Sequence, residues 1–159
     1  MQRHADIAAL MHDFYATISG GPGEQDWDGA AALFHPGATM VRTRIEDGVP
    51  RAWLFDHDGY VASTRAILAD RSFHEIETAR ECVRFGQIAQ VFSTYEARET
   101  PDSPDLIFRG VNMLHLWNDG ARCWIMSVIW DNEREGLALP ARWLAAPDPA
   151  RSRLNDQPS

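Results

Sequence analysis

Two runs of alternating apolar residues lie within residues 106–133, on either side of a polar Asn-Asp-Gly-Ala sequence. Asp-Gly between strand-like runs is a strong hairpin signal, because a type I′ turn needs positive φ at both central residues. The pattern therefore predicts one long β-hairpin. If Asp119 and Gly120 form a two-residue turn, Asn118 pairs with Ala121, and the rest of the register follows outward.

This register divides the hairpin into two faces, because successive side chains of a strand point to opposite sides. One face would carry His115 opposite Trp124, Met113 opposite Met126, Val111 opposite Val128 and Arg109 opposite Trp130. The other would carry Leu116 with Cys123, Leu114 with Ile125, Asn112 with Ser127 and Gly110 with Ile129. Both faces are mostly apolar, so we expect one to meet helices or a cavity and the other a second subunit.

Three helices are predicted before the hairpin, over residues 6–19, 27–34 and 60–70. The first has apolar residues at helical spacing and ends at a Gly-Gly-Pro-Gly sequence. Asp26 is placed to cap the second helix, and either Asp56 or Asp58 could cap the third, where an anion also suits the helix dipole. A His-Pro-Gly sequence at residues 35–37 is expected to break the second helix before the first strand.

Strands are predicted over residues 38–43 and 51–55 and in two long runs between residues 73 and 100. A turn at Phe85 and Gly86 would divide the long runs. One face of this pair would carry the polar residues Glu75, Glu77, Glu81, Gln90, Thr94 and Glu96, and we expect that face to lie in solvent. After the hairpin, a short helix would dock Trp143 and Leu144, and the polar tail over residues 147–159 is expected to be disordered.

Composition indicates an ordinary soluble globular protein with a single domain over residues 1–146. The chain has 159 residues, of which 45% are hydrophobic and 24% charged. A net charge of −8 argues against nucleic acid as a partner, because phosphates require a basic patch. No apolar run is long enough to cross a membrane, so a cytoplasmic protein is expected. Cys82 and Cys123 fall on separate strands and should be reduced thiols.

The order of these elements predicts an α+β fold. Three N-terminal helices would pack against one face of a strongly curved antiparallel sheet and close a cone-shaped cavity. Such a cavity is a natural site for a small molecule.

The chain resembles the nuclear transport factor 2-like superfamily, also called SnoaL-like or cystatin-like α+β cones. The resemblance rests on the helical start, the residues from Asp26-Trp27-Asp28 to Phe34, the block RFGQIAQVFSTYE at residues 84–96, and the hairpin. It covers about residues 5–133 and implies a fold rather than a reaction. The superfamily includes isomerases, dehydratases, cyclases, epoxide hydrolases and pure binding modules, so the site must decide the function.

The best-known chemistry of this superfamily does not transfer to the chain. In the ketosteroid isomerase branch, a helical tyrosine and a late-strand acid form an oxyanion hole, and a further acid is the base. Those positions match Phe14, Met113 and Arg42 here, and none has the required chemistry. Tyr15 is adjacent, but one residue turns it about 100° around the helix. The match does place the Met113 face of the hairpin toward the cavity.

Three polar residues are therefore candidates for catalysis. His115 could shuttle a proton within the cavity, or it could be a core histidine stacked on Trp124. Arg109 could stabilise a carboxylate or enolate oxygen, or it could have an internal carboxylate partner. Tyr95 could donate to a ligand, or bury its ring and bond the backbone. The expected ligand-binding residues are Trp130, Met113, Val111, Trp124, Met126, Phe14, Trp27 and Phe34.

The sequence predicts no metal and no cofactor. Asp56, His57 and Asp58 are consecutive before a helix, where they cannot all point at one ion, so capping is the preferred interpretation. Three functions stay open. The first is binding of a small apolar or aromatic, possibly acidic, molecule. The second is an isomerase, dehydratase or cyclase with His115 as acid–base and Arg109 as oxyanion stabiliser. The third is a homodimeric structural module, associated through the outer sheet face, whose cavity is vestigial.

Overall fold

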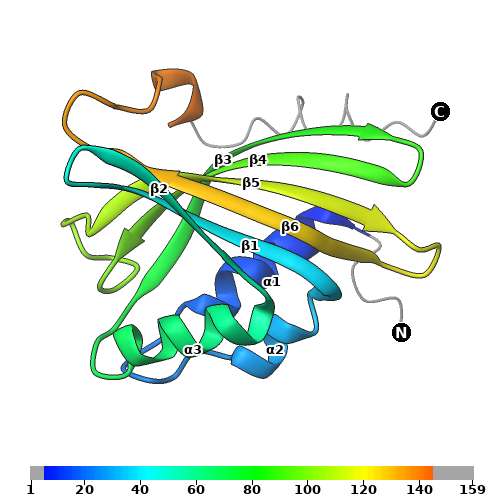
Figure 1. Ribbon diagram of the computed structural model, residues 1–159, viewed down its shortest axis with the longest axis horizontal. Coiled ribbons are helices and arrows are strands. Elements are labelled where there is room, and N and C mark those ends of the chain that lie inside the picture. The colour runs from blue at the N-terminus through cyan, green and yellow to red at the C-terminus, as the bar shows by residue number, and fades with distance from the viewer. Residues whose placement is uncertain (1–5, 145–159) are drawn as a thin grey trace.

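A computed structural model describes residues 6–144 of the chain. Its three helices gather on one side of a curved sheet, and the segment after the last strand lies on the other side (Figure 1). The helices are α1 (Ile7–Ile18), α2 (Trp27–Ala31) and α3 (His57–Leu68), with a short 3₁₀ helix, η1, at Ala141–Trp143. The strands are β1 (Phe34–Glu46), β2 (Val49–Phe55), β3 (His74–Phe85), β4 (Ile88–Arg98), β5 (Phe108–Asn118) and β6 (Cys123–Asn132). The predicted α+β fold is confirmed.

Each helix begins directly after an aspartate that caps it, and for the second and third helices that cap is one the sequence predicts. Asp6, Asp26 and Asp56 each accept a hydrogen bond from a backbone N–H in the first turn of α1, α2 and α3. These bonds satisfy donors that have no partner inside the helix. The second helix is shorter than predicted, because the chain has already entered β1 at Phe34.

The sheet has the order β2-β1-β6-β5-β4-β3 and is mixed rather than wholly antiparallel. The first strand pairs in parallel with β6, while every other neighbouring pair is antiparallel. No helix runs through residues 35–37, as predicted, but β1 begins before them rather than at residue 38, with a register shift between Phe34 and Thr39. Irregular pairing of this kind tolerates Pro36, which has no N–H to give to a ladder.

The central hairpin exists as predicted, but its turn and register differ. Asn118 pairs with Cys123 rather than with Ala121, so residues 119–122 form a wider loop. The Asp119 carboxylate accepts hydrogen bonds from the backbone N–H groups of Ala121 and Arg122, at 2.8 and 2.9 Å. Such side-chain bonds compete with a tight turn, and they account for the wider loop.

A β-bulge in β6 then changes which residues of that strand face inward. Leu116 pairs with Ile125 whereas His115 pairs with Ser127, so Met126 is the extra residue. Cys123 and Ile125 are buried before the bulge, and Val128 is buried after it. Because one inserted residue reverses the alternation, both sets reach the same inner face.

The β3–β4 hairpin has a similar irregularity, and its predicted register is also wrong. Phe85 pairs with Ile88, so the turn consists of Gly86 and Gln87. The register shifts between Glu77 and Ala79, where Thr78 is the extra residue. This bulge turns the start of β3 over, and Glu75 therefore faces the inside of the molecule rather than solvent.

The main core lies between α1 and the inner face of the sheet. Leu10 and Met11 from α1 are fully buried against Val91, Leu114 and Ile125 from three neighbouring strands. On the opposite face, Trp143 of the predicted C-terminal helix packs against Phe92 at a tilt, with ring centroids 4.4 Å apart. The core thus fills the space between α1 and the middle of the sheet.

Two remaining sequence predictions concern the C-terminal tail and membrane-spanning segments. The expected tail over residues 147–159 lies outside the described residues. Within residues 6–144, no helix is long and apolar enough to cross a membrane.

Candidate functional site

A cavity of about 180 Å³ lies between the three helices and the inner face of the sheet. All three helices and every strand from β1 to β6 except β2 contribute to its wall. Four aromatic residues that line it are Phe14, Trp27, Phe34 and Trp130. An apolar cavity of about 150 Å³ is enough to hold benzene, so the space suits a ligand with one or two rings.

Two arginines from β1 reach this cavity. Arg42 donates hydrogen bonds to Ser63 Oγ and Thr64 Oγ1 of α3, at 3.3 and 3.1 Å. Arg44, two residues further on the same strand, is exposed at the rim. Neither forms an ion pair with any residue between 6 and 144. Burial lowers the pKa of Arg42, but an arginine stays charged in such a site.

The Arg42 guanidinium also packs against aromatic rings. It lies 5.3 Å from the ring centroid of Phe55 and 5.9 Å from that of Trp130. These contacts hold the cation in place without neutralising it. The cavity therefore contains a fixed positive charge that lacks a counter-ion among the described residues.

Glu75 is the acidic residue of the cavity wall. Its backbone N–H donates to Ser19 Oγ at 3.0 Å, which fixes the start of β3 against the end of α1. Its carboxyl makes no hydrogen bond or ion pair with any residue between 6 and 144. Burial raises the pKa of this carboxyl to about 8, because the charged form loses its hydration. At neutral pH Glu75 is mainly protonated, and Arg42 dominates the charge of the cavity.

Tyr60 and His57 of α3 complete this side of the cavity. The Tyr60 ring packs edge-on against Trp130, with centroids 5.8 Å apart. Burial is the main cause that raises the pKa of Tyr60, and the Glu75 charge adds to it. Burial lowers the pKa of His57, whose Nε2 has no partner within the described part of the chain. Both rings are therefore neutral at pH 7.

Tyr95 lies on the opposite wall and binds a neighbouring side chain. Its hydroxyl donates to Asn132 Oδ1 at 2.6 Å, and burial raises the pKa of this phenol well above its usual value. Because Tyr95 occupies the amide oxygen of Asn132, the Asn132 N–H₂ group is the part left for a ligand. The predicted position of Tyr95 at the cavity is therefore found, and its role stays a prediction.

Four of the eight expected ligand-binding residues line the cavity: Phe14, Trp27, Phe34 and Trp130. The other four do not: Val111, Met113, Trp124 and Met126. Val111 and Met113 belong to the outer face of β5, and Met126 is the bulged residue of β6. Trp124 instead donates from Nε1 to Asp119 Oδ2 at 2.8 Å and packs under Arg122, which stabilises the hairpin loop.

The predicted cavity position of His115 is wrong. His115 is exposed on the outer face of β5, where its Nδ1 lies 3.2 Å from Ser127 Oγ. The error has a physical cause, because both faces of this strand are apolar and alternation does not say which one is inner. The residues that face inward are Leu114, Leu116 and Asn112.

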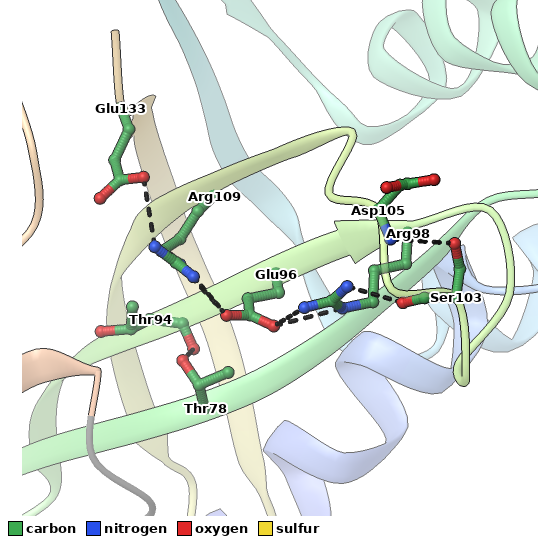
Figure 2. Close-up of polar contacts among 8 residues, drawn as sticks. All are labelled: Thr78, Thr94, Glu96, Arg98, Ser103, Asp105, Arg109 and Glu133. Carbon is green, nitrogen blue, oxygen red and sulfur yellow. Dashed lines mark hydrogen bonds and ion pairs between the residues drawn. The ribbon is translucent and has the colours of Figure 1, made fainter.

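Arg109 also lies on the outer face, within a network of ion pairs (Figure 2). Its Nη2 is 2.7 Å from Glu96 Oε1, and its Nη1 is 3.5 Å from Glu133 Oε2. Arg98 binds the other oxygen of Glu96 at 2.7 Å. Burial alone would raise the pKa of Glu96, but the two arginines outweigh it and the pKa is lowered. Arg109 thus has internal carboxylate partners, and the predicted placement in the cavity is wrong.

Sequence reasoning missed several polar residues of the cavity: Arg42 as a binding residue, Arg44, Glu75, Tyr60, Asn112 and Asn132. One signal was available in the isomerase matches at Phe14 and Met113. Their neighbours Tyr15 and Asn112 are in contact, with Asn112 Nδ2 donating to the Tyr15 hydroxyl oxygen at 3.2 Å. Moving the isomerase match by one residue on β5 would have replaced Met113 with Asn112 and placed Asn112 in the cavity.

The candidate site contains no recognisable metal centre. Among residues 6–144, no group of three or more histidine, cysteine, aspartate or glutamate side chains is placed to hold an ion. Asp56 caps α3 through a 2.8 Å hydrogen bond from the Gly59 N–H, as the capping interpretation predicted.

Comparison with known proteins gives a fold but no close relative. No family model matches the chain, and no curated protein matches it in sequence. Solved structures do match. The β subunit of a protein assigned as an aromatic-ring-hydroxylating dioxygenase, from Novosphingobium aromaticivorans, has a TM-score of 0.62 at 14% identity, covering 89% of this chain and 94% of that one.

Two further structures match this chain. An NTF-2-like protein of unknown function from Silicibacter pomeroyi has a TM-score of 0.57 at 15% identity, covering 81% of this chain and 94% of that one. A protein assigned as a ketosteroid isomerase, from Shewanella frigidimarina, has a TM-score of 0.53 at 14% identity, covering 80% and 96%. At such identities the likeness concerns the fold, and the chain has the NTF2-like, cystatin-like α+β fold.

Proposed function

We propose that the cavity binds a small, flat, apolar molecule that carries a carboxylate or another acidic oxygen. The observation that carries the proposal is Arg42, a partly buried cation in an aromatic wall with no acidic partner among the described residues. A buried charge without a partner is costly. A ligand anion would provide the missing partner.

Three further features support an anionic ligand. Arg44 stands at the rim on the same face of β1, and it pairs across the ladder with Arg51 of β2. Glu75, the acid in the wall, is mainly neutral at pH 7 and does not compensate Arg42. The protein as a whole has a net charge of −8, so this local excess of positive charge opposes the overall balance.

Calorimetric titration tests the proposal with 2-naphthoate and with 2-naphthalenemethanol, its neutral counterpart. We expect 2-naphthoate to bind more tightly, and Arg42→Met to weaken it by about 10- to 100-fold, since a hydrogen bond to a charged group contributes about 1.5–3 kcal/mol. Arg71→Met is the matched control, because Arg71 is exposed beside Asp70. Equal binding of the acid and the alcohol would exclude an anion site at Arg42.

A second candidate function is proton transfer by Glu75. The carboxylate form of Glu75, a minority at pH 7 and the major form above the pKa of about 8, can take a proton from carbon and return it as the carboxylic acid. Arg42 would then stabilise the enolate oxygen. Glu75 and Arg42 replace His115 and Arg109 in the isomerase hypothesis, because neither His115 nor Arg109 reaches the cavity.

Hydrogen–deuterium exchange separates the two candidates. We expect the protein to accelerate exchange at the activated carbon of 2-tetralone in D₂O, followed by NMR, and Glu75→Gln to abolish the acceleration. If wild type leaves the exchange rate unchanged while 2-naphthoate binds, the protein is a binding module for this class of ligand and acid–base catalysis is rejected.

A further inference from the structure

The side-chain amide of Asn112 is held in one orientation at the centre of the sheet. Asn112 lies on β5 between Ser93 of β4 and Trp130 of β6, and it is 5% exposed. It lines the cavity. An amide can present either its oxygen or its nitrogen to a ligand, so the orientation decides which ligand groups fit.

A chain of hydrogen bonds behind the wall fixes that orientation. It starts at Glu77, whose carboxylate accepts two hydrogen bonds from Arg80, at 3.0 and 2.9 Å. Glu77 Oε1 also accepts from Ser93 Oγ at 2.6 Å. Because a carboxylate held in this way only accepts, the single hydroxyl hydrogen of Ser93 is committed to Glu77.

The direction of the remaining hydrogen bonds follows from the number of hydrogens that each hydroxyl group has. Ser93 Oγ lies 2.7 Å from the Tyr15 hydroxyl, so Tyr15 must be the donor in that contact. The Tyr15 oxygen then accepts from Asn112 Nδ2 at 3.2 Å. Burial raises the pKa of Tyr15, which keeps its hydrogen in place. If the Asn112 amide were turned over, Tyr15 would need a second hydrogen that it does not have.

The Asn112 carbonyl oxygen is therefore the group that faces the ligand space. It accepts no hydrogen bond from residues 6–144, so it is available to accept one from a ligand. Arg42 lies on the far side of Trp130, since both Arg42 and Asn112 pair with that residue. The backbones of Arg42 and Asn112 are two strand spacings apart, about 10 Å. The aromatic ring of a ligand can therefore contact both side chains.

We propose that the ligand of this cavity carries an O–H or N–H donor directed at Asn112 Oδ1, in addition to the acidic oxygen held by Arg42. The inference rests on the proposed anion site and narrows the ligand class to hydroxylated or amino-substituted aromatic or cyclic acids. Tyr15 is a positioning residue in this scheme, because it orients Asn112 without lining the cavity. A site built to bind a donor discriminates strongly against the analogue that lacks it.

Calorimetric titration of the full chain with benzoate, 3-hydroxybenzoate, 4-hydroxybenzoate and 4-methoxybenzoate tests this inference. We expect at least one hydroxybenzoate to bind about tenfold more tightly than benzoate or the methyl ether. Asn112→Leu should remove the preference. Tyr15→Phe, which frees the amide to rotate, should reduce it while benzoate affinity stays as in wild type. Asn132→Leu is the matched amide control and should weaken all four acids alike.

The outcomes of this titration distinguish the donor requirement at Asn112 from the anion site proposed at Arg42. If benzoate and both hydroxybenzoates bind equally to wild type, the donor requirement is wrong while the anion site stands. If none of the four acids binds, both are wrong. A preference that persists in folded Asn112→Leu also overturns the inference. Should that variant fail to fold, Tyr15→Phe decides, because an unchanged preference in it contradicts the orienting chain.

Discussion

The Tyr95 hydroxyl and Asn132 Oδ1 meet at 2.6 Å over the α-carbon of Gly110. A methyl group at Gly110 would lie 2.2 Å from Asn132 Oδ1 and 2.6 Å from the Asp131 carbonyl oxygen. A backbone carbonyl cannot move aside as a flexible side chain can. This contact between β4 and β6 therefore depends on a residue without a side chain on the strand between them.

We expect Gly110→Ala to destabilise the protein by about 1–3 kcal/mol, the usual cost of overpacking. Urea unfolding measures the change. Gly37→Ala is the matched control, because a methyl group there meets only His35 at ordinary contact distances of 3.5 and 3.8 Å. Equal stability of Gly110→Ala and wild type would show that Tyr95 and Asn132 can separate freely.

The raised pKa of Glu75 makes stability depend on pH. Its pKa is 4.5 in the unfolded chain and about 8 in the fold. Between these values the folded state holds one more proton than the unfolded state, so stability falls as pH rises, by at most about 1.4 kcal/mol per pH unit. The contribution of Glu75 is fully present below pH 4.5 and is lost as pH rises through 8.

Glu75→Gln should flatten this dependence, because glutamine stays neutral without binding a proton. Urea unfolding at pH 5, 6, 7, 8 and 9 measures the slope. The free energy of unfolding of the variant, relative to that of wild type, should rise with pH and be highest at pH 8 and 9. Glu81→Gln, exposed on the same strand, is the control and should follow the wild-type slope. Parallel curves for Glu75→Gln and wild type would rule out a protonated Glu75.

The local signals of the sequence predicted the helices well. Asp26 and Asp56 are short polar side chains directly before predicted helices, and each is an N-cap in the structure. The existence of the two predicted hairpins was also correct, and their turns contain glycines with positive φ at residues 86 and 120. These features depend on neighbours in sequence, which a single chain displays directly.

The candidate site was harder to predict because it depends on two bulges and on the choice of a face. The extra residues Thr78 and Met126 reverse the alternation of their strands, and neither has a distinctive sequence. Glu75 was therefore expected in solvent although it lines the cavity. The ion pairs of Arg109 join β4, β5 and the residue after β6, and no local pattern reveals such partners.

Arg109 and Arg42 should respond to substitution in opposite ways. Arg109→Met should lower stability by about 1–2 kcal/mol, since its partly buried ion pairs with Glu96 and Glu133 are lost. It should leave the affinity for 2-naphthoate unchanged, because Arg109 does not line the cavity and its guanidinium is held by the ion pairs drawn in Figure 2. Loss of binding in a folded Arg109→Met variant would contradict this assignment and restore Arg109 as a candidate for the site.

We expect the homodimer to form through the outer face of the sheet. The residues exposed on this face differ from those that the sequence suggested. Met113 and Ile129 are paired neighbours on this face, and each is 43% exposed. Phe85 at the end of β3 is 81% exposed. The C-terminal segment packs on the same face through Trp143 and Phe92, which leaves these apolar side chains uncovered. A second copy of the chain would bury them in a two-fold interface.

Sedimentation velocity tests this interface. We expect wild type to be a dimer at tens of micromolar, and the double variant Met113→Glu, Ile129→Glu to be a monomer, because two opposed carboxylates would be buried at the contact. Ile67→Glu is the control, since Ile67 is 44% exposed on α3, on the other side of the sheet. A monomeric wild type would leave the exposed apolar face without a second subunit and exclude the homodimeric structural role.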